Sequence, residues 1–231
     1  MSHRDNIVRI KAVFNALGTL RKDVVFVGGS TVSLYADRIA EEVRPTNDVD
    51  ILIEIWTHRE YAEIEEQLRK MGFRNDMTSK VACRYTIGDT TVDVMATGEE
   101  VLGFSNKWYP AGYKNSIEHA IDNQHLIRIF SAPFFIATKL EAFKSPTRKD
   151  NNDGRYSSDF EDIIYILENR FNIWQELREA PAELKSYLVS EFARLQSSPL
   201  FADWIDAHAG YGSPPPSYYI RDQLKKFTEP V

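Results

Sequence analysis

Two short apolar segments separated by a glycine turn constrain most strongly what this chain can fold into. Residues 24–27 form the first apolar run, residues 49–53 form the second, and residues 28–30 between them read Gly-Gly-Ser. Apolar residues spaced three and four apart over residues 32–43 predict a helix that ends before Pro45. We therefore expect a strand, a helix and a second strand in succession.

Two aspartates, Asp48 and Asp50, lie at the start of the second strand. Successive side chains on a strand point to opposite faces, so the two aspartates share one face while Val49 and Ile51 enter the core. Two neighbouring carboxylates repel each other unless a cation or hydrogen-bond donors stabilise their negative charges. Their oxygens suit a hard divalent cation such as Mg²⁺, which proteins hold together with substrate phosphates. The alternative is that Asp48 only ends a loop and Asp50 is an edge charge.

A third carboxylate, Asp93, lies between Val92 and Val94 in another predicted strand. Residues 81–87 and 91–96 are separated by a Gly-Asp-Thr linker, which predicts a β-hairpin. The strand of Asp93 can then pair beside the strand of Asp48 and Asp50. Three strand-borne acids make the cation-site interpretation stronger than the pair alone.

The remaining pattern predicts an α+β protein with a mixed sheet, flanking helices and a mostly helical C-terminal lobe. Helical periodicity recurs over residues 7–17 and 61–71, and a short strand is expected at residues 125–130. Beyond residue 132 the periodic segments are all helical, apart from a polar loop over residues 144–158. We expect a core domain of residues 1–131 and a helical lobe of residues 132–231.

Composition limits the classes of function. The formal net charge of −6 argues against general DNA binding, although a local basic groove could still bind an RNA end. The single cysteine allows no intrachain disulfide, and a reducing cytoplasm is the expected location. The first residues lack the apolar core of a signal peptide, and no apolar run is long enough to span a membrane, so no membrane association is expected.

The turn formed by Gly28, Gly29 and Ser30 is compatible with phosphate binding. Glycines permit a tight turn and let main-chain N–H groups approach a phosphate near the start of a helix. Gly-Gly-Ser alone is a weak signal, because Ser30 could simply cap the following helix.

These motifs together resemble the signature of the DNA polymerase beta-like nucleotidyltransferase superfamily over residues 24–96. The matching features are the Gly-Gly-Ser turn, Asp48-Val49-Asp50 within residues 44–51, and the later strand with Asp93. Within that superfamily, residues 139–143 and 159–163 with the basic loop between them resemble the AbiEii-type nucleotidyltransferase toxins of type IV toxin/antitoxin systems. The resemblance implies a nucleotidyltransferase-like sheet, a nucleoside triphosphate substrate and a possible cognate antitoxin.

The resemblance also implies a role for each matching position. Asp48, Asp50 and Asp93 would bind two Mg²⁺ ions, with Mn²⁺ able to substitute, and Asp93 would help to deprotonate the attacking hydroxyl. The turn of Gly28, Gly29 and Ser30 would hold the triphosphate. Lys139 would bind phosphate charge, and Asp159 would orient this lysine or the acceptor. Asp162 is expected to be structural, capping its helix or pairing with Arg155.

The function that follows is metal-dependent transfer of a nucleoside monophosphate to a hydroxyl by a cytoplasmic, toxin-type enzyme. The resemblance favours a tRNA 3′ end or a protein side chain as acceptor, and Arg148, Lys149 and Arg155 could supply positive charge to an RNA end. One alternative is a small-molecule adenylyltransferase of the antibiotic-modifying kind. The other is a non-catalytic nucleotide-binding module of the same fold.

Overall fold

The chain was analysed as a computed structural model, which describes residues 2–38, 43–79, 81–146, 148, 152–210 and 215–229. It divides into two compact units. The first, here called the sheet unit, comprises residues 1–34 and 42–131, and the second, the helical unit, comprises residues 35–41 and 132–231. Within the described residues, no helix is long and apolar enough to cross a membrane.

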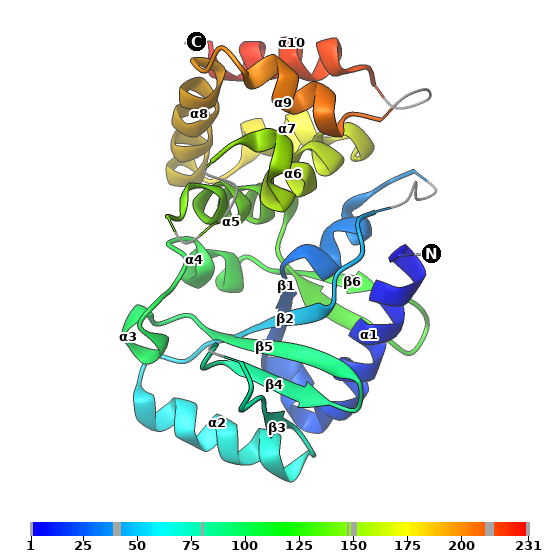
Figure 1. Cartoon of the computed structure of the whole chain (residues 1–231), viewed down its shortest axis with the longest axis vertical. Helices are drawn as coiled ribbons and strands as arrows, with labels where there is room; N and C mark the ends of the chain where they lie inside the picture. The colour runs from blue at the N-terminus through cyan, green and yellow to red at the C-terminus, as the bar shows by residue number, and fades with distance from the viewer. Residues whose placement is uncertain are drawn as a thin grey trace. The chain divides into compact units, whose positions relative to one another are not determined.

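The sheet unit contains a seven-stranded mixed sheet in the order β3-β4-β5-β2-β1-β7-β6 (Figure 1). The strands are β1 Val24–Val27, β2 Asp48–Ile53, β3 Arg74–Asn75, β4 Arg84–Ile87, β5 Thr90–Ala96, β6 Ile117–Ala120 and β7 Leu126–Ile129. β2 pairs parallel with β5, and β1 pairs parallel with β7, while the other neighbours are antiparallel. The pairing of the Asp93 strand beside the Asp48 strand is therefore confirmed.

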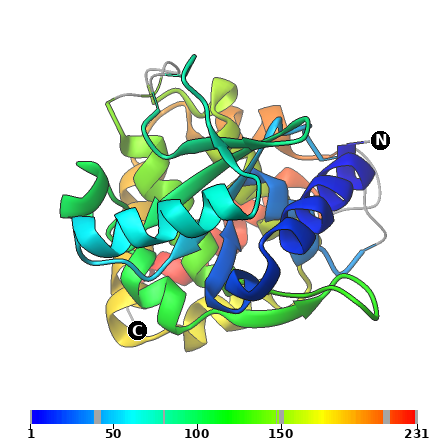
Figure 2. The same ribbon diagram turned by 90° about the horizontal axis from the view of Figure 1, so that it is seen from below.

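In the described part of the sheet unit, the α-helices are α1 Ser2–Ala16, α2 His58–Lys70, α3 Glu99–Leu102 and α4 Tyr109–Lys114. In Figure 2, α1 (dark blue) and α2 (cyan) lie in front of the strands, and α1 contacts β2 and β5. A capping box at Thr57 and Glu60 begins α2, and Gly72, with φ of +95°, follows its end. The short elements β3, α3, α4 and β6 were not predicted from the sequence.

The segment after β1 differs from the predicted helix. The structure has a 3₁₀-helix, η1, at Gly18–Asp23 before β1 and a second one, η2, at Gly29–Tyr35 after it; residues 39–42 of the predicted helix lie outside the described part. The Thr31 hydroxyl donates to the main-chain oxygen of Gly28 at 2.9 Å. Such local side-chain bonds to the main chain compete with α-helical hydrogen bonds, which explains the tighter turn.

The helical unit is built almost entirely of α-helices. They are α5 Ala132–Lys144, α6 Ser158–Asn169, α7 Ile173–Glu179, α8 Ala182–Gln196, α9 Phe201–His208 and α10 Ser217–Thr228, with a 3₁₀ turn, η3, at Gly154–Tyr156. Its core includes an aromatic cluster. The ring centroid of Phe160 lies 5.7 Å from that of Phe143 and 5.8 Å from that of Trp204. The predicted α+β class, a mixed sheet with flanking helices followed by a helical C-terminal part, is confirmed.

Candidate active site in the sheet unit

Three carboxylates share one face of the sheet. In the parallel register of β2 and β5, Asp50 lies directly beside Asp93, and Asp48 lies two residues before Asp50 on the same strand. Val49 and Ile51, which alternate with the aspartates, are fully buried on the opposite face. The structure therefore brings together Asp48, Asp50 and Asp93, which the sequence had suggested as a group.

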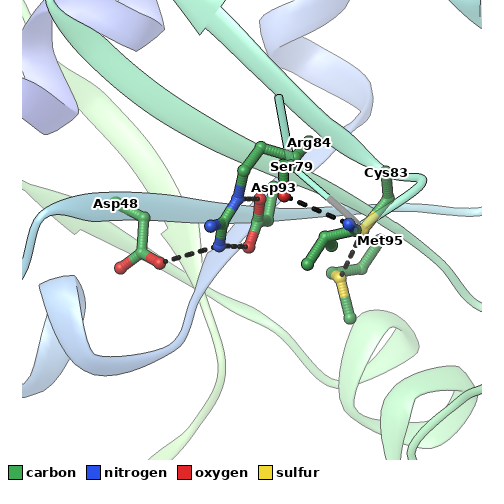
Figure 3. Close-up of polar contacts among 7 residues, drawn as sticks. Asp48, Ser79, Cys83, Arg84, Asp93 and Met95 are labelled. Carbon is green, nitrogen blue, oxygen red and sulfur yellow. Dashed lines mark hydrogen bonds and ion pairs between the residues drawn. The ribbon is translucent and has the colours of Figure 1, made fainter. Parts of the chain in front are cut away.

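An arginine, Arg84, extends this row of acids onto a third strand. Arg84 pairs directly with Asp93 in the antiparallel register of β4 and β5. Its Nε donates to Asp93 Oδ1 and its Nη2 to Asp93 Oδ2, each at 2.7 Å, and Nη2 also lies 3.3 Å from Asp48 Oδ2 (Figure 3). The guanidinium thus occupies both oxygens of one acid and one oxygen of a second.

We refer to Asp48, Asp50, Asp93 and Arg84 as the carboxylate row. The hydrogen bonds to Asp93 raise the pKa of Arg84 above its ordinary value despite partial burial, so the guanidinium remains charged. Next to the row, burial and the negative charge of Asp93 raise the pKa of the Cys83 thiol to about 12. Cys83 Sγ lies 3.7 Å from Met95 Sδ, and at neutral pH it is an uncharged buried thiol rather than a nucleophile.

The Gly28 turn lies against the carboxylate row. Gly28 has φ of +73°, and a Cβ atom there would overlap the carboxylate of Asp50. A Cβ atom on Gly29 would overlap the guanidinium of Arg44. Gly28 is therefore required by its backbone conformation and by the close approach of Asp50, whereas at Gly29 the flexible Arg44 side chain could move aside. Ser30 is buried, and its Oγ has no hydrogen-bond partner within the described part of the chain.

The loop before β2 is anchored by the first helix. The buried Thr46 hydroxyl donates to Asn6 Oδ1 at 2.9 Å, and Arg9 donates to the main-chain oxygen of Thr46. These bonds fix the point at which Asp48 enters the sheet. Sequence reasoning did not identify Asn6 or Arg9, because nothing in the sequence indicates which loop α1 packs against.

Lys139 and Asp159 lie in the helical unit, where they belong to a second, buried group of charges. Lys139 Nζ lies 3.0 Å from Asp159 Oδ1 and 2.7 Å from Asp162 Oδ2, and Arg148 Nη2 lies 2.6 Å from Asp159 Oδ2. We call these four residues the buried ion cluster, because its lysine and both aspartates are buried, while the Arg148 side chain at its edge is 45% exposed. The lysine partner predicted for Asp159 is thus present.

The expected partner of Asp162 was wrong. Asp162 pairs with Lys139, whereas Arg155 donates to Asp153, two residues before it, with Nη2 2.6 Å from Asp153 Oδ2. The short loop at Asp153 satisfies Arg155 locally and leaves Asp162 to the buried lysine. Lys149 lies outside the described residues.

The carboxylate row presents several carboxylate oxygens, and Arg84 pairs with both oxygens of Asp93. Carboxylate oxygens are the ligands that Mg²⁺ prefers. Within the described residues, however, no three His, Cys, Asp or Glu side chains are grouped so that they could hold an ion as they stand. The donor chemistry of Asp48, Asp50 and Asp93 fits Mg²⁺, but their present arrangement, with Arg84 paired to Asp93 and Asp48, does not form a metal-holding group.

Comparisons with known proteins give a structural likeness but no match to a family model or to a curated protein. Among solved structures, the solution structure of the antibiotic-resistance factor ANT(2'')-Ia is similar, with a TM-score of 0.48 and 16% sequence identity over 85% of this chain and 97% of that chain. A likeness of this strength carries no argument about the site or the activity.

Proposed function

We propose that this protein is a metal-dependent nucleotidyltransferase, which moves a nucleoside monophosphate from a nucleoside triphosphate to a hydroxyl group and releases pyrophosphate. The observation that carries the proposal is the register that sets Asp50 beside Asp93, with Asp48 on the same face. A glycine turn whose close packing requires Gly28 lies against this group.

Each residue of the group has a task in such a reaction. Asp48 and Asp50 would hold the ion, and Asp93 would accept the proton of the attacking hydroxyl on a carboxylate oxygen. The bond from the acceptor oxygen to the α-phosphorus forms as the bond from that phosphorus to the pyrophosphate oxygen breaks. When bound, Mg²⁺ supplies charge stabilisation to the attacking and leaving oxygens. The Gly28 and Gly29 turn lets the main chain approach the triphosphate.

The proposal does not depend on Lys139 or Asp159. The family resemblance implies that Lys139 binds phosphate and that Asp159 orients it, and both roles remain predictions. Both residues are buried and paired with each other inside the helical unit, which accounts for them as structural charges.

Two classes of acceptor are proposed for the test. The resemblance to AbiEii-type toxins favours a tRNA 3′ end or a protein side chain, and with it a cognate antitoxin. In the loop expected to attract RNA, however, Arg148 pairs with Asp159 and Arg155 with Asp153, which reduces the positive charge it presents. Together with the net charge of −6, this supports a small cationic acceptor as the second class.

The test is transfer of an α-labelled nucleotide. The protein is incubated with Mg²⁺, each of the four triphosphates in turn, and tRNA, a cell protein extract or an aminoglycoside. We expect label in one acceptor class with release of pyrophosphate, and loss of both in Asp50→Asn. Asp89→Asn, an exposed aspartate in the hairpin turn, is the matched control and should keep full activity. Triphosphate binding without transfer to any acceptor would instead identify a non-catalytic nucleotide-binding module.

A further inference from the structure

The guanidinium of Arg84 lies where a cation bound to Asp93 and Asp48 would have to lie. Both Asp93 oxygens accept from Arg84 at 2.7 Å, and Asp48 Oδ2 lies 3.3 Å from the same Nη2 atom. The planar fork of arginine matches a carboxylate in this bidentate way, and such charge-assisted pairs are among the stronger hydrogen bonds in proteins. A divalent ion on the same oxygens would face a positive charge only a few ångströms away.

We propose that Arg84 is a built-in counter-ion that competes with the divalent cation for Asp93 and Asp48, and that leaves Asp93 when cation and triphosphate bind together. The proposal rests on the proposed function and deepens it. Arg84 is then a specificity-determining residue of the site. It occupies both oxygens of Asp93 and keeps the metal from binding them until a phosphate ligand is present.

The main chain at Arg84 is fixed, while its side chain is partly open to water and could reach a ligand there. The Arg84 main-chain oxygen accepts from Asp76 N at 3.0 Å, its N–H donates to Val81 O at 3.2 Å, and the residue is paired in β4. The side chain itself is partly exposed, as is that of Asp48. The Asp93 side chain is only 11% exposed, so breaking the Arg84–Asp93 pair has a cost that new partners must offset.

A released guanidinium has an obvious new partner. The triphosphate brings several anionic oxygens to the same face of the sheet, and arginine binds phosphate in the same bidentate manner as carboxylate. The guanidinium then pairs with the phosphates as the divalent cation takes its place on Asp93, so the acid keeps a cationic partner. Without nucleotide, cation binding must break the Arg84 pair with no compensation.

The test is equilibrium binding of Mn²⁺, followed by the electron paramagnetic resonance signal of the free ion, without nucleotide. Arg84→Gln should bind Mn²⁺ about tenfold or more tightly than the wild type, because one charge-assisted pair no longer competes. Arg84→Lys keeps the charge but loses the fork, so its affinity should lie between the two. Arg74→Gln, which removes an exposed arginine from neighbouring β3, should stay within about twofold of wild type.

Adding a nonhydrolysable triphosphate gives a second readout. The difference in Mn²⁺ affinity between wild type and Arg84→Gln should shrink, because in the wild type the phosphates now bind Arg84. Arg84→Gln should in turn bind the triphosphate more weakly. If Arg84→Gln does not fold, the same two comparisons are made with Arg84→Lys.

The outcomes separate the inference from the function beneath it. Mn²⁺ binding that Asp50→Asn abolishes but that is equal in wild type and Arg84→Gln overturns the role of Arg84 and leaves the metal site standing. Affinity that falls in Arg84→Gln also overturns it, since the arginine would then support the ion. Absence of Mn²⁺ binding in every variant, with or without triphosphate, overturns the proposed function and the inference together.

Discussion

The carboxylate row of the sheet unit and the buried ion cluster of the helical unit differ chiefly in how far their carboxylates reach water. In the row, the side chain of Asp48 is 37% exposed and that of Asp93 is 11% exposed. In the cluster, the side chains of Asp159 and Asp162 are 2% and 1% exposed, and Arg148, at 45%, reaches water. Both groups contain carboxylates paired with cations at similar distances.

This difference determines what each group can do. Charges removed from water must keep their partners, because a buried charge left alone is very costly, so the buried ion cluster is suited to holding helices α5 and α6 together. Charges in partial contact with water can change partners at little cost. The carboxylate row has a carboxylate that reaches water and lies against the Gly28 turn, and we therefore propose that the chemistry takes place there.

The largest expected effect is on folding and comes from the buried ion cluster. Lys139→Met leaves Asp159 and Asp162 without their lysine and should lower the free energy of unfolding by about 3–5 kcal/mol. Lys144→Met, on the same helix, breaks the more exposed pairs with Glu141 and Glu191 and should cost about 1 kcal/mol or less. Urea denaturation of both variants measures the difference. Equal losses would end the distinction between the two groups.

The next effect is on activity and comes from the carboxylate row. Asp48→Asn and Asp50→Asn should each lower turnover by about 100-fold or more, because charge stabilisation worth several kcal/mol depends on the bound ion. Unfolding midpoints should change little, since amide and carboxylate have nearly the same shape. The transfer assay and thermal unfolding, with Asp89→Asn in parallel, check both statements. If a variant unfolds and transfer by the wild type does not depend on metal, these aspartates have a structural role instead.

A comparison of Gly28 with Gly88 tests whether close packing of the turn against the carboxylate row matters. Gly28→Ala adds a Cβ atom at positive φ that overlaps the Asp50 carboxylate, whereas Gly88→Ala has positive φ but no atom within 4 Å of the new Cβ. Backbone strain should cost each variant roughly 1–2 kcal/mol. Gly28→Ala should cost about 1–3 kcal/mol more through overpacking and should also impair transfer. If both variants behave alike in unfolding and activity, the close approach at Gly28 is unimportant.

The smallest expected effect concerns how the row is positioned. Thr46→Val removes the hydroxyl that donates to the buried Asn6 side chain and should lower the free energy of unfolding by about 1–2 kcal/mol. Because this bond fixes the entry of Asp48 into β2, turnover should fall more than stability alone explains. Comparing the KM for triphosphate with turnover in this variant tests the positioning role. Unchanged kinetics would confine Thr46 to folding.

Long periodic segments were the part of the fold that the sequence predicted well. Helices α1, α2, α5, α6 and α8 and strands β1, β2, β4, β5 and β7 all lie where apolar spacing placed them. Elements of four to eight residues, such as α3 and α7, were missed because so few positions give no clear period. The 12-residue helix α10 was also not predicted. The 3₁₀-helix at Gly29–Tyr35 was mistaken for an α-helix. Apolar spacing gives no sign of the hydrogen bond from the Thr31 hydroxyl to the main-chain oxygen of Gly28.

The central acids of the candidate site could be grouped from the sequence, but their partner was missed. Asp48, Asp50 and Asp93 were expected on neighbouring strands, which the register confirms. The signal for Arg84 was present: a two-residue turn pairs Ile87 with Thr90, and counting back along the hairpin pairs Arg84 with Asp93. The roles predicted for Ser30, Lys139 and Asp159 rest on resemblance, and no property of the sequence predicts their burial.

The central claim is that the carboxylate row binds a catalytic cation. The most direct test is anomalous diffraction from crystals soaked with Mn²⁺ and a nonhydrolysable nucleoside triphosphate. The account predicts a peak within coordination distance of the carboxylate oxygens of Asp48 and Asp50, with Arg84 withdrawn from Asp93. Bound triphosphate with no anomalous peak at these residues, and Arg84 still paired with Asp93, would contradict it.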